Sequence, residues 1–263
     1  MSLKQRIYED YLKKSRLPAY RRTLQVAKLH GYQMVGILDF TRIVRRGNLS
    51  GKKIYINRHD IDTSPKVAAE MFEIEKEIYG RTGTATYYFR NSTIDKKLIN
   101  VIDAYGYETG YHYEELATFT KENKLRSKEE IVSHINEAGE VFLNGLKRFR
   151  DITGSSSVTI ASHGDFINTR YDIQSYEMLK NQFIREKAGI EVEAYDDEIM
   201  HYVQERFADQ QLLDNYPEVV INAFEHEIPV VMTLTHPRNW EIDVLANTIE
   251  NFRRIIQDLR YRK

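Results

Sequence analysis

Short apolar or β-branched runs alternate along the chain with longer segments whose apolar residues recur every three or four positions. The short runs have the length of β-strands, and the longer segments have the periodicity of amphipathic helices. Such alternation is typical of βα units, whose successive strands lie parallel in one sheet. It predicts an α/β fold, either a (β/α) barrel or a doubly wound sheet. Strands are expected at 32–38, 54–60, 84–90, 108–113, 158–164, 191–195 and 230–236.

Residue types at helix ends mark two of the intervening helices. Ser64 followed by Pro65 is typical of an N-cap and a first helical position. Ser127 with Glu130 has the spacing of a capping box, and the helix that follows is expected to end before Gly154. A third amphipathic helix is expected near the end of the sequence, where the apolar positions are Leu245, Ile249, Phe252, Ile256 and Leu259.

No Pro- or Gly-rich linker divides the 263 residues, so a single domain is expected. In it, residues 1–50 would form a helical and strand extension packed on a barrel of residues 51–263. The net charge of -1 gives no support for a nucleic-acid partner. The sequence lacks both a signal-peptide pattern and an apolar stretch near 18 residues, which predicts a cytoplasmic protein without an integral membrane segment. The oligomeric state is left open.

Ionisable residues stand at the C-terminal ends of five expected strands. In parallel α/β folds these ends meet on one face, where ligands bind and catalysis takes place. Residues that are far apart in the sequence should therefore share one pocket. They are Asp60, Asp62, Arg90, His112, His163 and His236.

Each of these residues also has an ordinary structural interpretation. An aspartate before a helix is often a cap or turn residue, but Ser64 is available for that task. Asp60 and Asp62 are two positions apart, so in an extended chain their carboxylates point to the same side. His59 should point the opposite way and support the site rather than react. The three histidines of the set could instead be satisfied by backbone groups or turns.

The chain has no cysteine, so any metal must be held by His, Asp or Glu. An Asp/His/His set suits zinc or a similar divalent ion. Such an ion lowers the pKa of bound water from 15.7 to about 7. A second carboxylate can then accept the proton of that water, and a distant histidine can protonate the leaving group. Glu114 could also complete a metal site with His112.

Four segments resemble the motifs of the polysaccharide deacetylase superfamily, carbohydrate esterase family four, over most of residues 54–240. RHDID resembles the first motif, usually Thr-Phe-Asp-Asp-Gly, in a two-carboxylate variant. GTATYYFR resembles the Ala-Thr-Phe-Phe strand that follows it. ETGYHYEE resembles the Gly-x-His motif, and LTHP resembles the late Leu-x-His motif. The resemblance implies a distorted (β/α) barrel of about seven parallel strands.

The resemblance also implies roles for matching residues. Asp60 would be the general base, Asp62 and His112 metal ligands, and His236 the general acid. The sequence departs from the family pattern at the second metal histidine, where it has Leu116. It also lacks the Arg-x-Pro-Tyr motif, in whose place it has ASHGDF at 161–166. The third ligand is therefore open between His163, which is favoured, and Glu114.

These features predict a metal-dependent hydrolase, with zinc the favoured ion. It would remove an acetyl or formyl group from an amino sugar or a nucleotide- or lipid-linked sugar during surface-polysaccharide synthesis. Arg90, Glu114 and Trp240 are candidate substrate contacts. Arg90 would hold a phosphate or carboxylate, or instead pair with Asp60 or Glu114. The rival hypotheses are an inactive carbohydrate-binding protein on the same scaffold and a hydrolase of an ester or ring amide.

Overall fold

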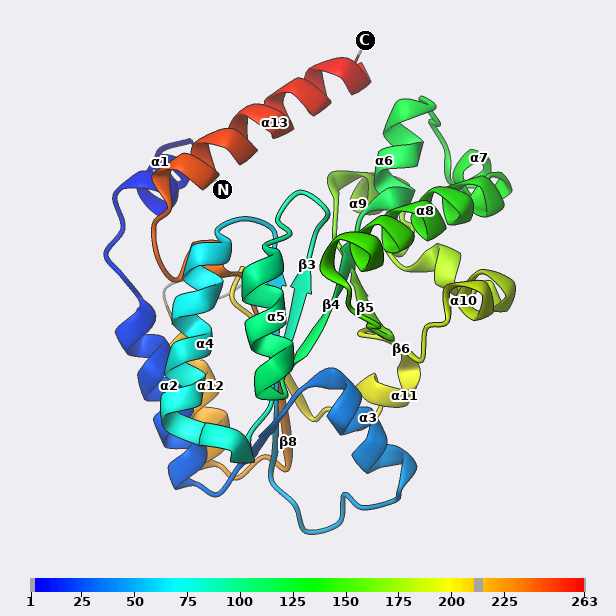
Figure 1. The fold of residues 1–263 in the computed structure, drawn as a ribbon. Helices are drawn as coiled ribbons and strands as arrows, with labels where there is room; N and C mark the ends of the chain where they lie inside the picture. Colours follow the sequence, from blue (N-terminus) through cyan, green and yellow to red (C-terminus); the bar gives the residue numbers. More distant parts are fainter. Residues whose placement is uncertain (1–2, 211–214, 263) are drawn as a thin grey trace.

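The computed structural model describes residues 3–210 and 215–262, and its strands form one parallel sheet (Figure 1). The strand order is β6-β5-β4-β3-β2-β8-β7, and β1 pairs with the first half of β2. The sheet curls into a half-barrel that stays open between its edge strands β6 and β7, so the expected α/β fold, a distorted (β/α) barrel, is confirmed. The strands are β1 (Gln33–Val35), β2 (Ile54–Ile61), β3 (Thr86–Phe89), β4 (Glu108–Tyr113), β5 (Thr159–Ser162), β6 (Val192–Glu193), β7 (Glu205–Ala208) and β8 (Val230–Thr235).

Helices cover the outside of the half-barrel and one of its ends. The helices of the described residues are α1 (Leu3–Tyr11), α2 (Leu17–Leu29), α3 (Ile37–Arg45), α4 (Pro65–Tyr79), α5 (Lys96–Tyr105), α6 (Glu115–Glu122), α7 (Lys128–Ser133), α8 (Ile135–Thr153), α9 (Phe166–Tyr171), α10 (Gln182–Ala188), α11 (Asp197–Met200), α12 (Tyr216–Glu225) and α13 (Val244–Arg262). Short 3-10 turns lie at Gly80–Thr82, Glu177–Lys180 and Pro237–Asn239. Within the described chain, no helix has both the length and the apolar composition needed to cross a bilayer.

Strand β2 runs through the middle of the sheet, and all eight of its residues are buried. Its side chains alternate between two apolar clusters, as the period of a strand requires. Tyr55 and Ile61 belong to the larger cluster under the outer helices, whereas Ile54 and Ile56 belong to the smaller cluster inside the half-barrel. The next even-numbered residues of β2 therefore enter the interior of the half-barrel above Ile56.

All seven strands expected from the sequence are present, and β7 is an addition. β7 is short and forms an edge of the sheet, and its Glu205 and Arg206 are exposed while Phe207 is buried. One buried apolar residue in a four-residue strand is too weak a pattern to predict a strand.

Helix α4 begins at Pro65 as expected, but the predicted capping role of Ser64 is wrong. Ser64 has φ 60° and ψ 58°, in the left-handed region, and in the part of the chain that the structure describes its side chain makes no capping hydrogen bond. An N-cap side chain reaches the first helical turn from an extended backbone, which Ser64 does not have.

The helix expected after Ser127 is divided in two. The Ser127 hydroxyl accepts a hydrogen bond from the Glu130 N–H at 3.1 Å, as a cap should. The Glu130 carboxylate, however, accepts from Arg126 N–H and not from the cap residue. α7 ends after one and a half turns, and α8 starts beyond His134 and ends at Gly154 in the left-handed conformation, as expected.

The first 50 residues contribute to the main core. β1 extends the sheet beside β2, and α2 packs against α4 and α12. Tyr20 and Leu24 of α2 are buried in the larger apolar cluster.

Candidate metal and catalytic site

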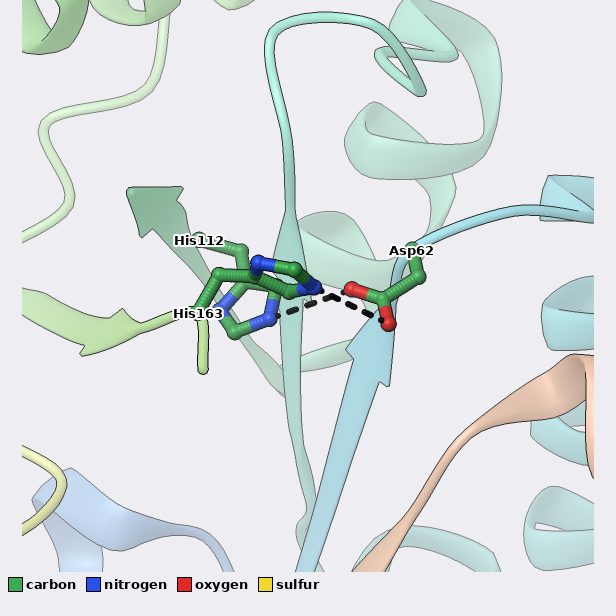
Figure 2. A group of neighbouring side chains, drawn as sticks. All are labelled: Asp62, His112 and His163. Atoms are coloured by element: carbon green, nitrogen blue, oxygen red, sulfur yellow. Dashed lines mark ion pairs between the residues drawn. The ribbon is translucent and has the colours of Figure 1, made fainter. Parts of the chain in front are cut away.

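All six ionisable residues at the strand ends converge at one end of the half-barrel, where Arg90, after β3, shares a pocket with Asp62 and His163. Asp60 is near the end of β2 and Asp62 directly follows it, while His112, His163 and His236 come from β4 and the ends of β5 and β8. His112 Nε2 lies 3.3 Å from Asp62 Oδ1 and 3.5 Å from Asp60 Oδ2. His163 Nε2 lies 3.4 Å from Asp62 Oδ2. Figure 2 shows both imidazoles directed at the Asp62 carboxylate.

Asp62, His112 and His163 offer three ligand atoms that all lie within 4.8 Å of one another. Within the described residues, Asp62 Oδ1 and His112 Nε2 are buried and have no hydrogen-bond partner. Unsatisfied polar atoms are costly in a protein interior, so their clustering points to a missing partner. One carboxylate and two imidazoles form a donor set that fits zinc or a related divalent ion.

The second nitrogen of His112 fixes the orientation of its ring. His112 Nδ1 lies 3.0 Å from the carbonyl oxygen of Ala161, to which it can donate only if it carries the proton. Nε2 then faces Asp62 and is the ring nitrogen placed to bind an ion. Metal-binding histidines commonly have such a second bond.

The charge of the cluster favours an ionised Asp62. Burial by itself would raise the pKa of this carboxyl, but the imidazoles of His163 and His112 outweigh that effect and hold the pKa well below its usual range. A deprotonated carboxylate is the form that binds metal.

Glu114 lies beside the cluster but is engaged elsewhere. Its carboxylate forms an ion pair with Arg90, and it lies 3.8 Å from His163 Nδ1. Burial would raise the pKa of Glu114, but Arg90 lowers it to about 2. Of the two candidates for third ligand, this geometry favours His163.

Arg90 is buried at 1% exposure, and it pairs with Glu114 and, at 3.4 Å, with Glu250 of α13. Of the alternatives left open by the sequence, the structure shows the ion pair with Glu114. Both acids therefore compete with any anionic group of a substrate for this guanidinium.

Asp60 has a partner that the sequence analysis missed. Arg58 Nε and Nη2 each donate to one oxygen of the Asp60 carboxylate at 2.8 Å, and both residues are fully buried. Burial would raise the pKa of Asp60, but Arg58 lowers it. The signal was present in RHDID, because residues two apart in a strand share a face. The Arg58 guanidinium also lies 4.6 Å from the ring centre of Tyr195.

His236 is paired with Asp209, which was also missed. Nδ1 of His236 lies 2.7 Å from Asp209 Oδ1, and the His236 N–H donates to Oδ2 at 2.7 Å. Burial would lower the pKa of His236, but Asp209 raises it to about 9. Asp209 directly follows β7, the strand that the sequence pattern did not predict.

Trp240 supports this pair and is not placed to stack on a sugar. It is 2% exposed, and its Nε1–H donates to Asp209 Oδ2 at 3.0 Å. Its ring packs edge-on against Tyr20 and Tyr216. The indole has no free face in this arrangement.

His59 points away from Asp60, as expected from strand alternation. Nδ1 lies 2.6 Å from Thr235 Oγ1, and Nε2 lies 2.7 Å from Glu75 Oε1. Its ring stacks on Tyr87 with 4.3 Å between ring centres. This buried network ties β2 to β8 and α4 directly beneath the site.

No protein-family model matches the sequence, and no curated protein matches it. Solved structures that are distantly similar to this chain include the following three. A mutant of BA3943, described as a CE4 family pseudoenzyme with restored enzymatic activity, is 15% identical over 78% of this chain and 64% of that chain, with a TM-score of 0.40. Polysaccharide deacetylase Bc1974 from Bacillus cereus is 15% identical over 77% of this chain and 88% of that chain, with a TM-score of 0.40.

The third structure is peptidoglycan deacetylase PdaC from Bacillus subtilis, which is 12% identical over 81% of this chain and 98% of that chain, with a TM-score of 0.34. The present chain thus spans 64% of the length of the BA3943 protein. The likenesses are too distant to assign an activity, which has to be inferred from the site itself.

Proposed function

We propose that the chain is a metal-dependent hydrolase that removes an N-acetyl or N-formyl group from an amino sugar or a nucleotide- or lipid-linked sugar. The observation that carries this proposal is the Asp62, His112 and His163 cluster, whose unsatisfied atoms lie near a second carboxylate, Asp60, and a third histidine, His236. These three residues would hold the ion, with zinc favoured. When bound, such an ion polarises an acyl carbonyl and makes a water molecule acidic near neutral pH.

The remaining groups have the protonation states that amide hydrolysis needs. The pKa of Asp60 is lowered, so its carboxylate is ionised at neutral pH and can accept the proton of the attacking water. Arg58 donates one hydrogen bond to each oxygen of this carboxylate and so fixes its orientation. The pKa of His236 is about 9, so at neutral pH its imidazole is protonated and can donate to the leaving amine. Asp60 can therefore act as the base and His236 as the acid, because Arg58 lowers the pKa of the first and Asp209 raises the pKa of the second.

The proposed reaction is tested by incubating the zinc-loaded chain with matched substrates and measuring released acid and free amine. N-acetyl and N-formyl amino sugars, free and nucleotide- or lipid-linked, are compared with an O-acetyl sugar and a cyclic amide. We expect turnover of N-acyl sugars that disappears in Asp62→Asn. Turnover of the ester or cyclic amide alone would replace the proposal with another hydrolase. Sugar binding without any turnover would indicate a non-catalytic carbohydrate-binding protein.

The pH dependence of this activity should report the pKa of His236, which Asp209 raises. His236 acts in its protonated form, so kcat/KM should fall as the pH rises through about 9. Asp209→Asn removes the main cause of the raised pKa and should move this alkaline limb down toward the ordinary value of 6.5. The pH profile of Asp172→Asn, a change at an exposed carboxylate, serves as the control. An unmoved limb in Asp209→Asn would exclude His236 as the acid.

The Asp209–His236 pair also makes the free energy of unfolding depend on pH. The pKa of His236 is higher in the folded chain than the ordinary value of 6.5. Its contribution to the free energy of unfolding is therefore complete below 6.5 and is lost as the pH rises through about 9.

A further inference from the structure

Helix α13 has the reverse of the polarity usual for a surface helix. Surface helices normally bury their apolar stripe and expose their polar face. In α13, Asn247 and Glu250 are buried, whereas Leu245, Ile249 and Phe252 are between 61% and 71% exposed. Figure 1 shows α13 crossing one end of the molecule with α1 beside its first turns.

The inward face of α13 is fixed by polar contacts with α1. Asn247 Nδ2 donates to the Asp10 carbonyl oxygen at 2.9 Å. Asn251 Nδ2 donates to Asp10 Oδ2 at 2.9 Å, and Arg6 Nη2 donates to Asn251 Oδ1 at 2.8 Å. These bonds set the rotation of α13 about its axis. Its apolar side chains therefore face outward as a consequence of specific contacts.

The exposed apolar residues of α13 and of the adjacent α1 segment are here together called the α1/α13 patch. Its members, each between 45% and 71% exposed, are Ile7, Tyr8, Leu12, Val244, Leu245, Ile249, Phe252, Ile255 and Ile256. With about 150–200 Å² for a whole side chain of this kind, their exposed part is on the order of 900 Å². The largest apolar patch of a typical monomer is only about 300–600 Å². A standard interface buries about 800 Å² on each partner.

The spacing of the apolar residues in α13 identifies the kind of partner. Positions 245, 249, 252, 256 and 259 are separated by four, three, four and three residues, which is the a/d spacing of a coiled-coil seam. Such spacing suits packing against another helix that has the same spacing. A second copy supplies such a helix, and a self-complementary apolar patch is what a twofold dimer requires.

We propose that the α1/α13 patch is the interface of a homodimer, in which α13 packs against α13 of a second copy. The dimer would also fix one wall of the site. Ile249, Glu250 and Arg253 of α13 line a cavity of about 530 Å³ that reaches Asp62. Glu250 forms an ion pair with Arg90. Arg90 also pairs with Glu114, which lies beside His163. The proposal itself does not depend on the activity of the site.

The test is the mass of the full chain in solution, measured by sedimentation velocity over a range of concentrations. We expect a species of two 31.0-kDa chains. Leu245→Glu and Phe252→Glu should each raise the dimer dissociation constant at least ~100-fold, because a twofold interface would bury two unpaired carboxylates. Both side chains are exposed in the single chain, so the circular dichroism of the variants should match wild type.

Phe183→Glu is the matched control, because Phe183 is an equally exposed aromatic residue on α10, outside the patch. It should leave the dimer intact. A wild-type chain that stays monomeric at all concentrations would overturn the proposal. Co-sedimentation of that monomer with phosphatidylcholine–phosphatidylglycerol vesicles would assign the patch to a membrane surface instead. A dimer that persists unchanged in both glutamate variants would place the interface elsewhere.

Discussion

Replacing Arg58 by methionine should lower the free energy of unfolding by about 3–5 kcal/mol, because it leaves a buried carboxylate without its partner. Arg58 and Asp60 are 0% and 2% exposed, and their two hydrogen bonds are each 2.8 Å long. Urea unfolding followed by circular dichroism measures the loss.

A double variant separates the unpaired charge from other effects of the change. Arg58→Met combined with Asp60→Asn removes the buried charge, so it should recover most of the lost stability. Arg45→Met is the control, because Arg45 pairs with Glu198 at an exposed surface position. It should cost less than about 1 kcal/mol. If Arg58→Met costs no more than Arg45→Met, the buried pair does not stabilise the site.

Replacing Asp60 by asparagine should reduce the rate of N-acyl hydrolysis by about 100- to 10,000-fold. The side-chain amide has nearly the shape of the carboxylate but cannot accept the proton of the attacking water. Metal content should be unchanged, because Asp60 is outside the Asp62, His112 and His163 cluster. Initial rates with the best substrate of the N-acyl panel, together with metal content, provide the measurement, and circular dichroism confirms the fold because the change leaves Arg58 without its charged partner.

Asp172→Asn is again the control for a change from carboxylate to amide at an exposed position, and it should retain the wild-type rate. Full activity in Asp60→Asn would remove this residue from the reaction. Loss of metal in the same variant would make Asp60 a ligand rather than a base.

The convergence of the site residues was predictable, because each strand can be recognised from its local apolar pattern and parallel strands of an α/β fold end on the same face. Each of β2, β4, β5 and β8 had a clear apolar pattern, and the ends of parallel strands meet on one face. The same regularity placed His59 on the opposite side of β2 from Asp60.

The partners of the site residues were not predictable in the same way. Asp209 follows an edge strand with one buried apolar residue, and its pairing with His236 depends on how β7 lies against β8. Trp240 was an obvious aromatic candidate, but its environment is set by packing against α2 and α12. The sequence pattern of α13 shows that the helix is amphipathic, but it does not show which side faces the protein. Contacts with α1 decide that orientation.

The central claim is that Asp62, His112 and His163 hold a divalent ion, and elemental analysis of the purified, metal-loaded chain tests it most directly. After gel filtration we expect about one ion per chain, with zinc favoured. Asp62→Asn, His112→Ala and His163→Ala should each lose the ion, with their folds confirmed by circular dichroism, whereas Asp60→Asn should keep it. A wild-type chain that retains no ion when metal is supplied, or variants that bind it as well as wild type, would contradict the account.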